Sequence, residues 1–432
     1  MKKNVKKILF TTPILEHPAA GGPALRITNS IKALNAISEL HVISRVSFLA
    51  LGGAFAENHF RSMCHRFEYS PSARKPNLLN KIANYRVGIK NMPLYQFINL
   101  PFRVFSRIYN LAESKLRNYF DQDVRFINNY VIKNLIDIIW FGYGNISYLL
   151  MKELKSNLPS VKMVCDTDSV WSRFILRELE VKKDPERFKR IEAEGKKKEE
   201  EEKQWVEFCD ITTAVSEVDA EYYRGIANDP YRIKIFSNVI DVDNYKNIPS
   251  PPINFKKPCI YLAGTFWEKS PMDYAARWVI KDIFPIIKKE IPDLYFYIIG
   301  KGSDTVLSDV NDKDITITGK VDTVLPYLCN SDVSIVPLKF ESGTRFKILE
   351  AGVCGIPIVS TTLGAEGINL ENGVDITLAD TAENFAQSII RIIKDRSLAE
   401  ALSANCKKKI YEEHSIENLK QEGINIINFL GN

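Results

Sequence analysis

The sequence lacks long hydrophobic runs. None of its uncharged apolar stretches reaches the ~18–20 residues that a membrane-spanning helix needs. The lysine-rich start has the charge of a signal peptide, but its apolar run is short, contains Pro13 and has no small-residue cleavage site before Glu16. We therefore expect a cytoplasmic protein.

Paired cysteines and a dinucleotide fingerprint are also missing. The seven cysteines are scattered, with no CxxC pair and no histidine at zinc-finger spacing, which excludes a disulfide scaffold and a zinc finger. No expected strand is followed by GxGxxG with an acidic residue ~20 positions later, which argues against a dehydrogenase or another dinucleotide-dependent enzyme. The composition, 45% hydrophobic and 26% charged, is that of a globular protein and excludes a disordered chain.

The chain contains many short β-branched or aromatic runs separated by helical patterns, such as 24–37, 270–289, 344–354 and 382–394. Most runs are continuously hydrophobic, as expected for strands covered on both faces. Twelve strands are predicted, at 8–12, 40–44, 136–141, 163–167, 211–216, 232–237, 259–264, 294–300, 315–319, 333–337, 356–361 and 375–379. This alternation predicts an α/β protein with doubly wound, Rossmann-like parallel sheets.

A proline-rich segment at 247–258 marks the expected domain boundary, because its four prolines disfavour both helix and sheet interior. We expect a first domain at 1–246 and a second at 257–410, facing each other across a cleft. Residues 411–432 are expected to form a final helix that packs back toward the first domain. Within the first domain, 61–135 are basic and short of strand signals, which predicts a helical insertion.

A glycine pair lies between the first expected strand and the first expected helix. Gly21 and Gly22 allow backbone N–H groups to approach a ligand, and Arg26 follows on the helix, whose positive start favours anions. A loop that merely needs positive φ angles is the alternative.

A polar turn follows the strand at 163–167. Asp166, Asp168, Ser169 and Arg173 stand where the ligand crevice of an open α/β sheet is found, at the carboxyl ends of the strands. Capping of the next helix by Asp168 or Ser169 is the alternative, and both roles are compatible.

The strongest motif runs from Val336 to Thr361 and reads VPLKFESGTRFKILEAG, then GIPIVST. A strand ends in a loop with Gly343, a helix begins near Thr344, and Arg345 and Lys347 flank its positive end. This arrangement suits a diphosphate, which both the helix dipole and the cations would stabilise. Glu350, two turns into the helix, could accept hydrogen bonds from a ribose diol.

At this point the sequence resembles a family. The string GTRxKxxEA…GxPxVST is similar to the donor-site motif of GT-B glycosyltransferases, in particular the retaining family-4 group. The resemblance covers most of the chain: the opening strand and glycine loop at 8–26, TAVS at 213–216, FSNVID at 236–241, the loop at 264–269 and IIGKG at 298–302.

The resemblance implies roles for individual residues. A catalytic set would stabilise the leaving nucleotide, hold the ribose and face the acceptor: Lys269, Arg345, Lys347, Glu350 and Asp168. A second set would bind the diphosphate, the base and the sugar: Gly21, Gly22, Arg26, Thr265, Gly300, Lys320, Val321, Gly343 and Thr344. No cofactor and no metal are implied, although Asp166 and Asp168 form a literal Asp-x-Asp pair.

Three positions depart from the family pattern. Ser342 stands where the first of two glutamates seven residues apart is expected, with Glu341 one position away. Thr265 replaces an arginine in the loop at 264–269, and Asp168 replaces a histidine. These changes suggest a particular subgroup and leave a degenerate, non-catalytic member as an alternative.

The net charge of +5 is unevenly distributed. Residues 61–120 carry eleven Lys or Arg and two acids, so this block has a charge of +9 and the rest sums to −4. Within it, 100–120 combine an aromatic stripe with flanking arginines, which is typical either of a helix on an anionic membrane or of a buried stripe with solvated charges. No nucleic-acid-binding motif accompanies the charge, so nucleic acid is not an expected partner.

These observations predict a glycosyltransferase that moves a sugar from a nucleoside diphosphate donor to an acceptor hydroxyl, with retention. The expected partners are the nucleotide sugar and a glycan or glycolipid acceptor in cell-surface glycan synthesis, with peripheral contact of 100–120 at the inner face of the membrane. The alternatives are a non-catalytic GT-B binding or assembly protein and, less favoured, another dinucleotide-dependent α/β enzyme.

Overall fold

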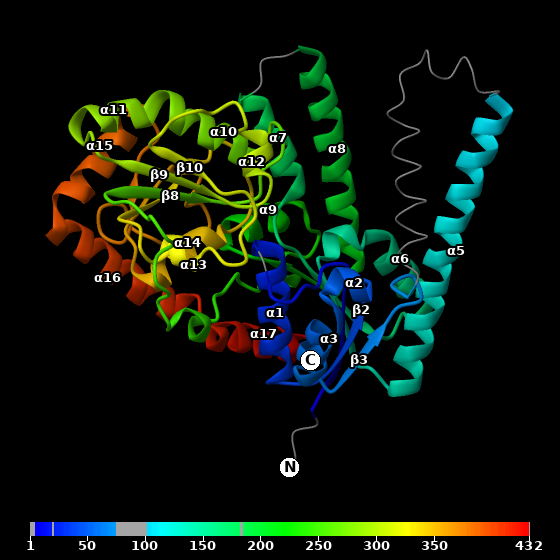
Figure 1. Cartoon of the computed structure of the whole chain (residues 1–432). Helices are drawn as coiled ribbons and strands as arrows, with labels where there is room; N and C mark the ends of the chain where they lie inside the picture. Colours follow the sequence, from blue (N-terminus) through cyan, green and yellow to red (C-terminus); the bar gives the residue numbers. More distant parts are fainter. Residues whose placement is uncertain (1–4, 20, 75–101, 182–184, 432) are drawn as a thin grey trace. The chain divides into compact units, whose positions relative to one another are not determined.

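The computed structural model describes residues 5–19, 21–74, 102–181 and 185–431, without the side chains of 102–116 and 181–186. The fold consists of two β-sheets with helices in the connections between their strands (Figure 1). No helix in the described part of the chain is both long and apolar enough to cross a membrane.

The first sheet has seven strands in the order β3-β2-β1-β4-β5-β6-β7. The strands are β1 (Lys7–Thr12), β2 (Glu39–Ser44), β3 (Arg66–Tyr69), β4 (Ile138–Gly142), β5 (Lys162–Asp166), β6 (Ile211–Ala214) and β7 (Ile233–Ile235). The pairs from β3 through β5 are parallel, with Ile8 of β1 opposite Leu40 of β2 and Ile138 of β4.

The second sheet has six strands in the order β10-β9-β8-β11-β12-β13, all paired in parallel. The strands are β8 (Cys259–Ala263), β9 (Tyr295–Ile299), β10 (Ile315–Ile317), β11 (Val333–Val336), β12 (Ile358–Ser360) and β13 (Thr377–Leu378). Both sheets reverse their strand order after the first strand, as doubly wound sheets do. The predicted fold class is confirmed, and all twelve predicted strands are present, nine of them shorter than predicted.

The helices occupy the connections between strands. The earlier ones are α1 (Gly22–Asn35), α2 (Phe48–Leu51), α3 (Gly53–Ser62), α5 (Phe102–Asn134), α6 (Tyr148–Asn157), α7 (Trp171–Val181), α8 (Pro185–Phe208) and α9 (Glu217–Ile226). The later ones are α10 (Pro271–Trp278), α11 (Phe284–Glu290), α12 (Ser303–Val306), α13 (Leu325–Leu328), α14 (Phe346–Cys354), α15 (Ala382–Lys394), α16 (Arg396–Glu413) and α17 (Ile416–Gly431). Short 3₁₀ segments lie at Gly144–Ile146, Pro230–Arg232 and Val242–Tyr245.

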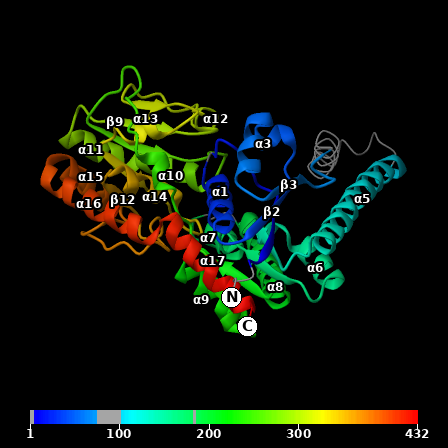
Figure 2. The same ribbon diagram turned by 90° about the horizontal axis from the view of Figure 1, so that it is seen from below.

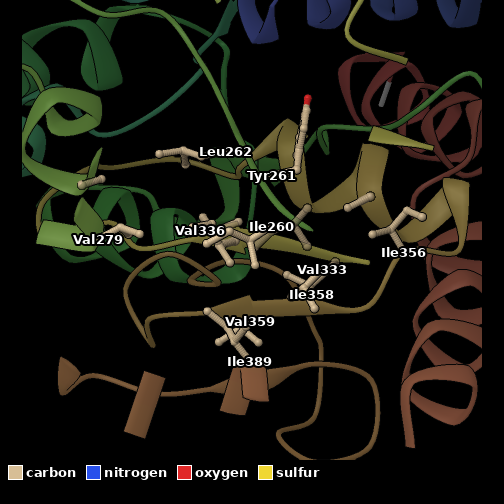
Figure 3. Close-up of a cluster of buried hydrophobic side chains, with 14 of the residues drawn as sticks. Ile260, Tyr261, Leu262, Val279, Val333, Val336, Ile356, Ile358, Val359 and Ile389 are labelled. Atoms are coloured by element: carbon tan, nitrogen blue, oxygen red, sulfur yellow. The ribbon is translucent and has the colours of Figure 1, made fainter. Parts of the chain in front are cut away.

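The second sheet is buried on both faces. Side chains from β8, β11 and β12 meet those of the covering helices in one cluster, in which Ile260, Val336 and Ile389 are fully buried (Figure 3). Helix α11 packs on α15, and α14 packs on α16. This two-sided burial explains why the strands read as continuous apolar runs.

The prediction that 61–135 form a helical insertion is wrong at 66–69. Residues Arg66–Tyr69 form β3, which pairs with β2 and is the edge strand of the first sheet. An edge strand needs little hydrophobic character, and in β3 only Phe67 is buried, so the segment has no apolar run. Residues Phe102–Asn134 form α5, a single long helix that Figure 2 shows in cyan, and 75–101 lie outside the described residues.

The predicted helix at 270–289 is interrupted. A π-helical turn at Val279–Ile283 separates α10 from α11. Pro285, near the start of α11, has no N–H to donate to Lys281, so the regular α-helical hydrogen bonding cannot continue through this turn.

The chain divides into two compact units. The first contains 1–19, 34–166 and 205–212, and the second contains 20–33, 167–204 and 213–432. The domain limits at 246 and 257 stay predictions. Within the second unit, the C-terminal helix α17 contacts the segment around β7: Glu422 accepts hydrogen bonds from the backbone N–H and the hydroxyl of Ser237, both at 2.7 Å.

Candidate active site

The second sheet places two loops side by side. Strands β8 and β11 are neighbours although they are far apart in the sequence, and the strand order reverses between them. In open α/β sheets ligands bind at this reversal point, outside the carboxyl ends of the strands. The loops that leave β8 and β11 contain the 264–269 segment and the SGTR motif, respectively.

The loop after β11 is packed tightly against the polar turn after β5. Gly343 has φ +79°, and a Cβ atom there would lie 2.7 Å from the backbone oxygen of Asp168 and 2.9 Å from Cβ of Ser169. A larger residue would therefore be strained by its backbone angle and would also collide with this turn. The second and third sequence motifs thus meet at Gly343.

The glycine pair reaches the same helix. A Cβ atom on Gly22, the first residue of α1, would lie 3.1 Å from the ring of Phe346, the first residue of α14. Gly21 has φ +81°, which glycine adopts without strain. The structure therefore brings all three motifs together at the start of α14.

Arg345 is the N-cap residue of α14, and the helix has no side-chain cap. Its side chain is 5% exposed, and one terminal nitrogen, Nη2, donates to the backbone oxygen of Leu363 at 3.3 Å. Its Nε and Nη1 have no hydrogen-bond partner among the described residues. Burial lowers the pKa of Arg345, but a guanidinium keeps its charge at neutral pH. The neighbouring Thr344 is buried and donates to the backbone oxygen of Val215 at 3.5 Å.

Lys347 is the second residue of α14 and is half-buried. Its Nζ atom lies 2.9 Å from the sulfur of Met272, a weak acceptor. Burial lowers the pKa of Lys347 to about 8. This side chain is therefore a cation at pH 7 with a proton that it can lose in mildly alkaline solution.

Glu350 lies one turn further along α14. It accepts a hydrogen bond from the hydroxyl of Tyr245 at 2.9 Å. Burial raises the pKa of Glu350, while the hydrogen bond from Tyr245 and the charge of Lys347 oppose this shift. The carboxylate has acceptor capacity left for a ligand, since an ionised carboxylate can accept several hydrogen bonds.

The predicted base-binding residues adjoin one another on the neighbouring strands. A Cβ atom on Gly300, which has φ +129°, would lie 1.9 Å from the backbone oxygen of Gly264, so only glycine fits this crossing. The Gly300 N–H donates to the backbone oxygen of Gly319 at 3.0 Å, immediately before the exposed Lys320 and the half-buried Val321. Thr265, after Gly264, is exposed.

Three predicted residues make contacts that hold the protein itself. Lys269 is exposed and its Nζ lies 3.2 Å from Glu268. Arg26 donates to the side-chain oxygen of Asn238 at 2.8 Å and to the backbone oxygen of Phe236 at 3.1 Å. Asp168 accepts a hydrogen bond from the indole of Trp171 at 3.1 Å. Their roles toward a substrate stay predictions.

The structure adds an ion-pair network that the sequence analysis missed. Arg177 of α7 forms a two-point contact with Glu366 (2.6 and 2.7 Å) and donates to the backbone oxygen of Glu341 at 2.7 Å. Burial tends to raise the pKa of Glu366, but hydrogen bonds from Arg177 outweigh it, so the pKa is lowered. Arg173 also donates to Glu366 at 3.3 Å. The network fixes the backbone of the loop before α14.

One signal for this network was present in the sequence. Arg173 stood in the polar turn, and Arg177 follows four residues later, on the same face of α7. Their partner Glu366 lies in the loop after β12, outside every motif, and only the tertiary structure brings it to α7.

Two further buried polar side chains, Ser342 and Asp219, belong to the surroundings of this loop. Ser342, where a glutamate was expected, is buried, and its hydroxyl has no hydrogen-bond partner within the described residues. Asp219 lies 3.8 Å from Arg173, and burial raises its pKa to about 6 although Arg173 opposes the shift.

Part of the second half of the chain matches a known family. Residues 257–395 match the family model described as glycosyl transferases group 1. This range includes both loops at the strand reversal and α14.

Solved structures share the fold over nearly the full length. Sucrose-phosphate synthase from Thermosynechococcus elongatus superposes with a TM-score of 0.66 at 13% identity, covering 98% of this chain and 99% of that one. HepE from Anabaena, solved with UDP and glucose, gives 0.61 at 12% identity, covering 98% and 99%. TarM from S. aureus, solved with UDP among its ligands, gives 0.63 at 12% identity, covering 98% and 100%.

One curated sequence relative is described as an uncharacterized 44.6 kDa protein in the cps region of Klebsiella pneumoniae. It is 25% identical over 147 residues, which is 32% of this chain. The match spans 38% of the length of that relative.

Proposed function

Residues 257–395 of this chain belong to the group 1 glycosyltransferases and the whole chain has the GT-B fold; on that premise we propose that the protein transfers a sugar from a nucleoside diphosphate donor to an acceptor hydroxyl. The second sheet and α14 would hold the donor. By family resemblance the transfer would proceed with retention.

The observation that carries this proposal is that Arg345 is buried while its Nε and Nη1 have no hydrogen-bond partner among the described residues. Buried N–H groups without partners are costly, and in a guanidinium the cost is higher than in a neutral group. A bound anion would relieve it. The start of α14, which has no side-chain cap, points the same way, because a helix N-terminus attracts negative charge.

A diphosphate fits this position better than a single carboxylate. Arg345 and Lys347 offer two cations on one helical turn, and the backbone of Gly22 packs close to Phe346 at the start of the same helix. When the glycosidic bond to the donor breaks, negative charge grows on the leaving diphosphate. Fixed cations at that place stabilise the transition state more than the ground state.

The proposed positions of the ribose and the base follow from the same geometry. Glu350, held by Tyr245, would accept hydrogen bonds from the ribose hydroxyls. The crossing of Gly300 over Gly264, with Lys320 and Val321 nearby, would receive the base. Uracil is the first base to test, because HepE and TarM were solved with UDP.

The acceptor is proposed to be a glycan or glycolipid of the cell surface. Support comes from the relative in a cps region and from the galactosyltransferase WaaB of the lipopolysaccharide outer core, which matches with a TM-score of 0.55 at 14% identity over 98% of this chain and 99% of that one. Contact of 100–120 with an anionic membrane belongs to the same proposal. Most side chains of that stretch lie outside the described residues.

The first experiment is a thermal-shift panel with UDP, GDP, ADP and CMP. A ligand at ~100 times its Kd should stabilise the folded protein by ~2.7 kcal/mol. We expect one diphosphate to raise Tm and CMP to have no effect. A folded sample that responds to none of the three diphosphates would contradict the donor assignment.

Turnover is tested separately by following release of the nucleoside diphosphate from its sugar, with and without acceptor extracts. Binding without any release would favour the alternative, a GT-B protein that binds but does not catalyse. The replacement of a glutamate by Ser342 is the observation that keeps this alternative in view.

A further inference from the structure

A second cluster of chemically active side chains lies in the first unit, around the amino ends of β2 and β3. Glu39 and His41 are the first and third residues of β2, so their side chains point to the same face of the sheet. His65 directly precedes β3, and its N–H donates to the backbone oxygen of Leu40 at 2.7 Å. The pairing of the two strands thus brings His65 beside Glu39 and His41.

The donor atoms of these three residues converge. Nε2 of His41 lies 3.2 Å from Oε1 of Glu39, and Nε2 of His65 lies 3.6 Å from the same oxygen. All three ligand atoms lie within 4.8 Å of one another. Around a tetrahedral zinc ion with bonds of ~2.0–2.1 Å, neighbouring ligand atoms are about 3.3 Å apart. The two spacings to Glu39, 3.2 and 3.6 Å, are close to this value.

His41 is already held by a second group. It is buried, and its other ring nitrogen, Nδ1, lies 3.0 Å from the hydroxyl of Tyr130. Histidines that bind metals usually donate this second N–H to a neighbour, which fixes the ring and the tautomer. A tyrosine hydroxyl can accept this hydrogen bond, leaving Nε2 with its lone pair directed toward Glu39.

The opposite side of the cluster is open to water. His65 is 55% exposed and Glu39 30% exposed, so a metal ion would have an entry path and a water molecule as its fourth ligand. Two imidazoles and one carboxylate are ligands that zinc and its neighbours in the first transition row favour.

We propose that Glu39, His41 and His65 bind a divalent metal ion of the zinc class, which links the start of β2 to the start of the edge strand β3. The donor site proposed above needs no such ion. Ligands of doubly wound sheets bind at the carboxyl ends of the strands, whereas this cluster lies at the amino ends, so its role is to stabilise the sheet.

One nearby cation opposes the metal. Nζ of Lys7 lies 3.7 Å from the same Glu39 oxygen. Arg66 is also close in sequence, but its guanidinium donates to the side chain of Asn134 at 2.8 Å. Lys7 therefore competes with a metal ion for Glu39, and its removal should strengthen metal binding.

The test uses the whole protein, with Co²⁺ as a spectroscopic probe and Zn²⁺ in calorimetry. Wild type should bind one equivalent, with the visible bands of a nitrogen- and oxygen-bound Co²⁺ and a rise in Tm. His65→Ala should weaken binding at least tenfold. The matched control is His59→Ala: His59 stacks on His17 at 3.6 Å between ring centres, outside this cluster, and its removal should leave binding unchanged.

A second variant separates metal binding from a simple ion pair. Lys7→Gln should bind Zn²⁺ several-fold more tightly than wild type, although it removes a contact that stabilises the protein without metal. Equal binding by wild type and His65→Ala, a near-ultraviolet thiolate band that assigns Co²⁺ to cysteines, or no gain in Lys7→Gln would each overturn the proposal. None of these readouts depends on glycosyl transfer, so they stand apart from the donor tests.

Discussion

The loops that follow β8 and β11 leave neighbouring strands of one sheet, yet they hold their cations differently. The loop after β8 exposes Lys269 to solvent beside Glu268, while the loop after β11 buries Arg345 and leads to the half-buried Lys347. An exposed ion pair is screened and contributes little, whereas a buried cation acts in a medium of lower dielectric constant. A position near the strand reversal is therefore not enough for a cation to stabilise the diphosphate. We expect the buried cation to contribute more than the exposed one.

The largest effect is expected at Arg345. Arg345→Met removes the buried guanidinium at the start of α14 and should reduce the rate of nucleoside diphosphate release by ~100- to 1,000-fold, the usual loss when one oxyanion donor is removed. Arg345→Lys keeps the charge but loses the fork of N–H donors, so it should recover only part of the rate. Full activity of Arg345→Met in a folded sample would contradict the claim that the buried cation contributes most.

A smaller effect, a loss of diphosphate affinity, is expected when Glu350 of α14 is replaced. Glu350→Gln should weaken diphosphate binding by roughly tenfold or more, because a hydrogen bond to a charged group contributes ~1.5–3 kcal/mol. Tyr245→Phe is the matched control, since it keeps the carboxylate and loses only the hydrogen bond that orients it. Calorimetric titration measures both, and a Tyr245→Phe loss larger than that of Glu350→Gln would show that the carboxylate does not contact the ligand.

Lys347 should make donor binding depend on pH. Its pKa is about 8 because burial lowers it, and the protonated form attracts the diphosphate. As pH rises through 8, the charge is lost and affinity should fall, by no more than tenfold per pH unit. Titrations from pH 6.5 to 9.5 should show this fall in wild type and in Lys269→Met. The curve of Lys347→Met should be nearly flat; a fall that persists in it would assign the titration to another group.

The smallest effect is expected at Lys269. An exposed ion pair is worth ~0.2–1 kcal/mol, so Lys269→Ala should change diphosphate affinity by less than about fivefold. Isothermal titration at low and high salt measures it. If Lys269→Ala lost as much diphosphate affinity as Arg345→Met, the loop after β8 would have to move onto the ligand. The expected difference between the exposed Lys269 and the buried Arg345 would then be wrong.

The sequence predicted most of the fold because the buried parallel strands are short apolar runs. It missed β3, since an edge strand with one buried side chain, Phe67, carries no such signal. It also missed the break before α11, which depends on how the π turn accommodates Pro285.

The candidate site was predictable where its residues share a motif. Gly343, Arg345, Lys347 and Glu350 lie within one short loop and the helix that follows it, so their proximity follows from local structure. The pairing of Arg177 with Glu366 joins a helix to a distant loop, and no local pattern reveals it. The same holds for the cluster around Glu39, where strand pairing and not sequence spacing brings His65 to His41.

The central claim is that the buried guanidinium of Arg345 binds the diphosphate. The most direct measurement compares a nucleoside diphosphate with its monophosphate, for the base that stabilises the protein best, by calorimetry on wild type and Arg345→Met. Wild type should prefer the diphosphate strongly, and Arg345→Met should lose most of that preference while its affinity for the monophosphate changes little. An unchanged preference in Arg345→Met would contradict the account.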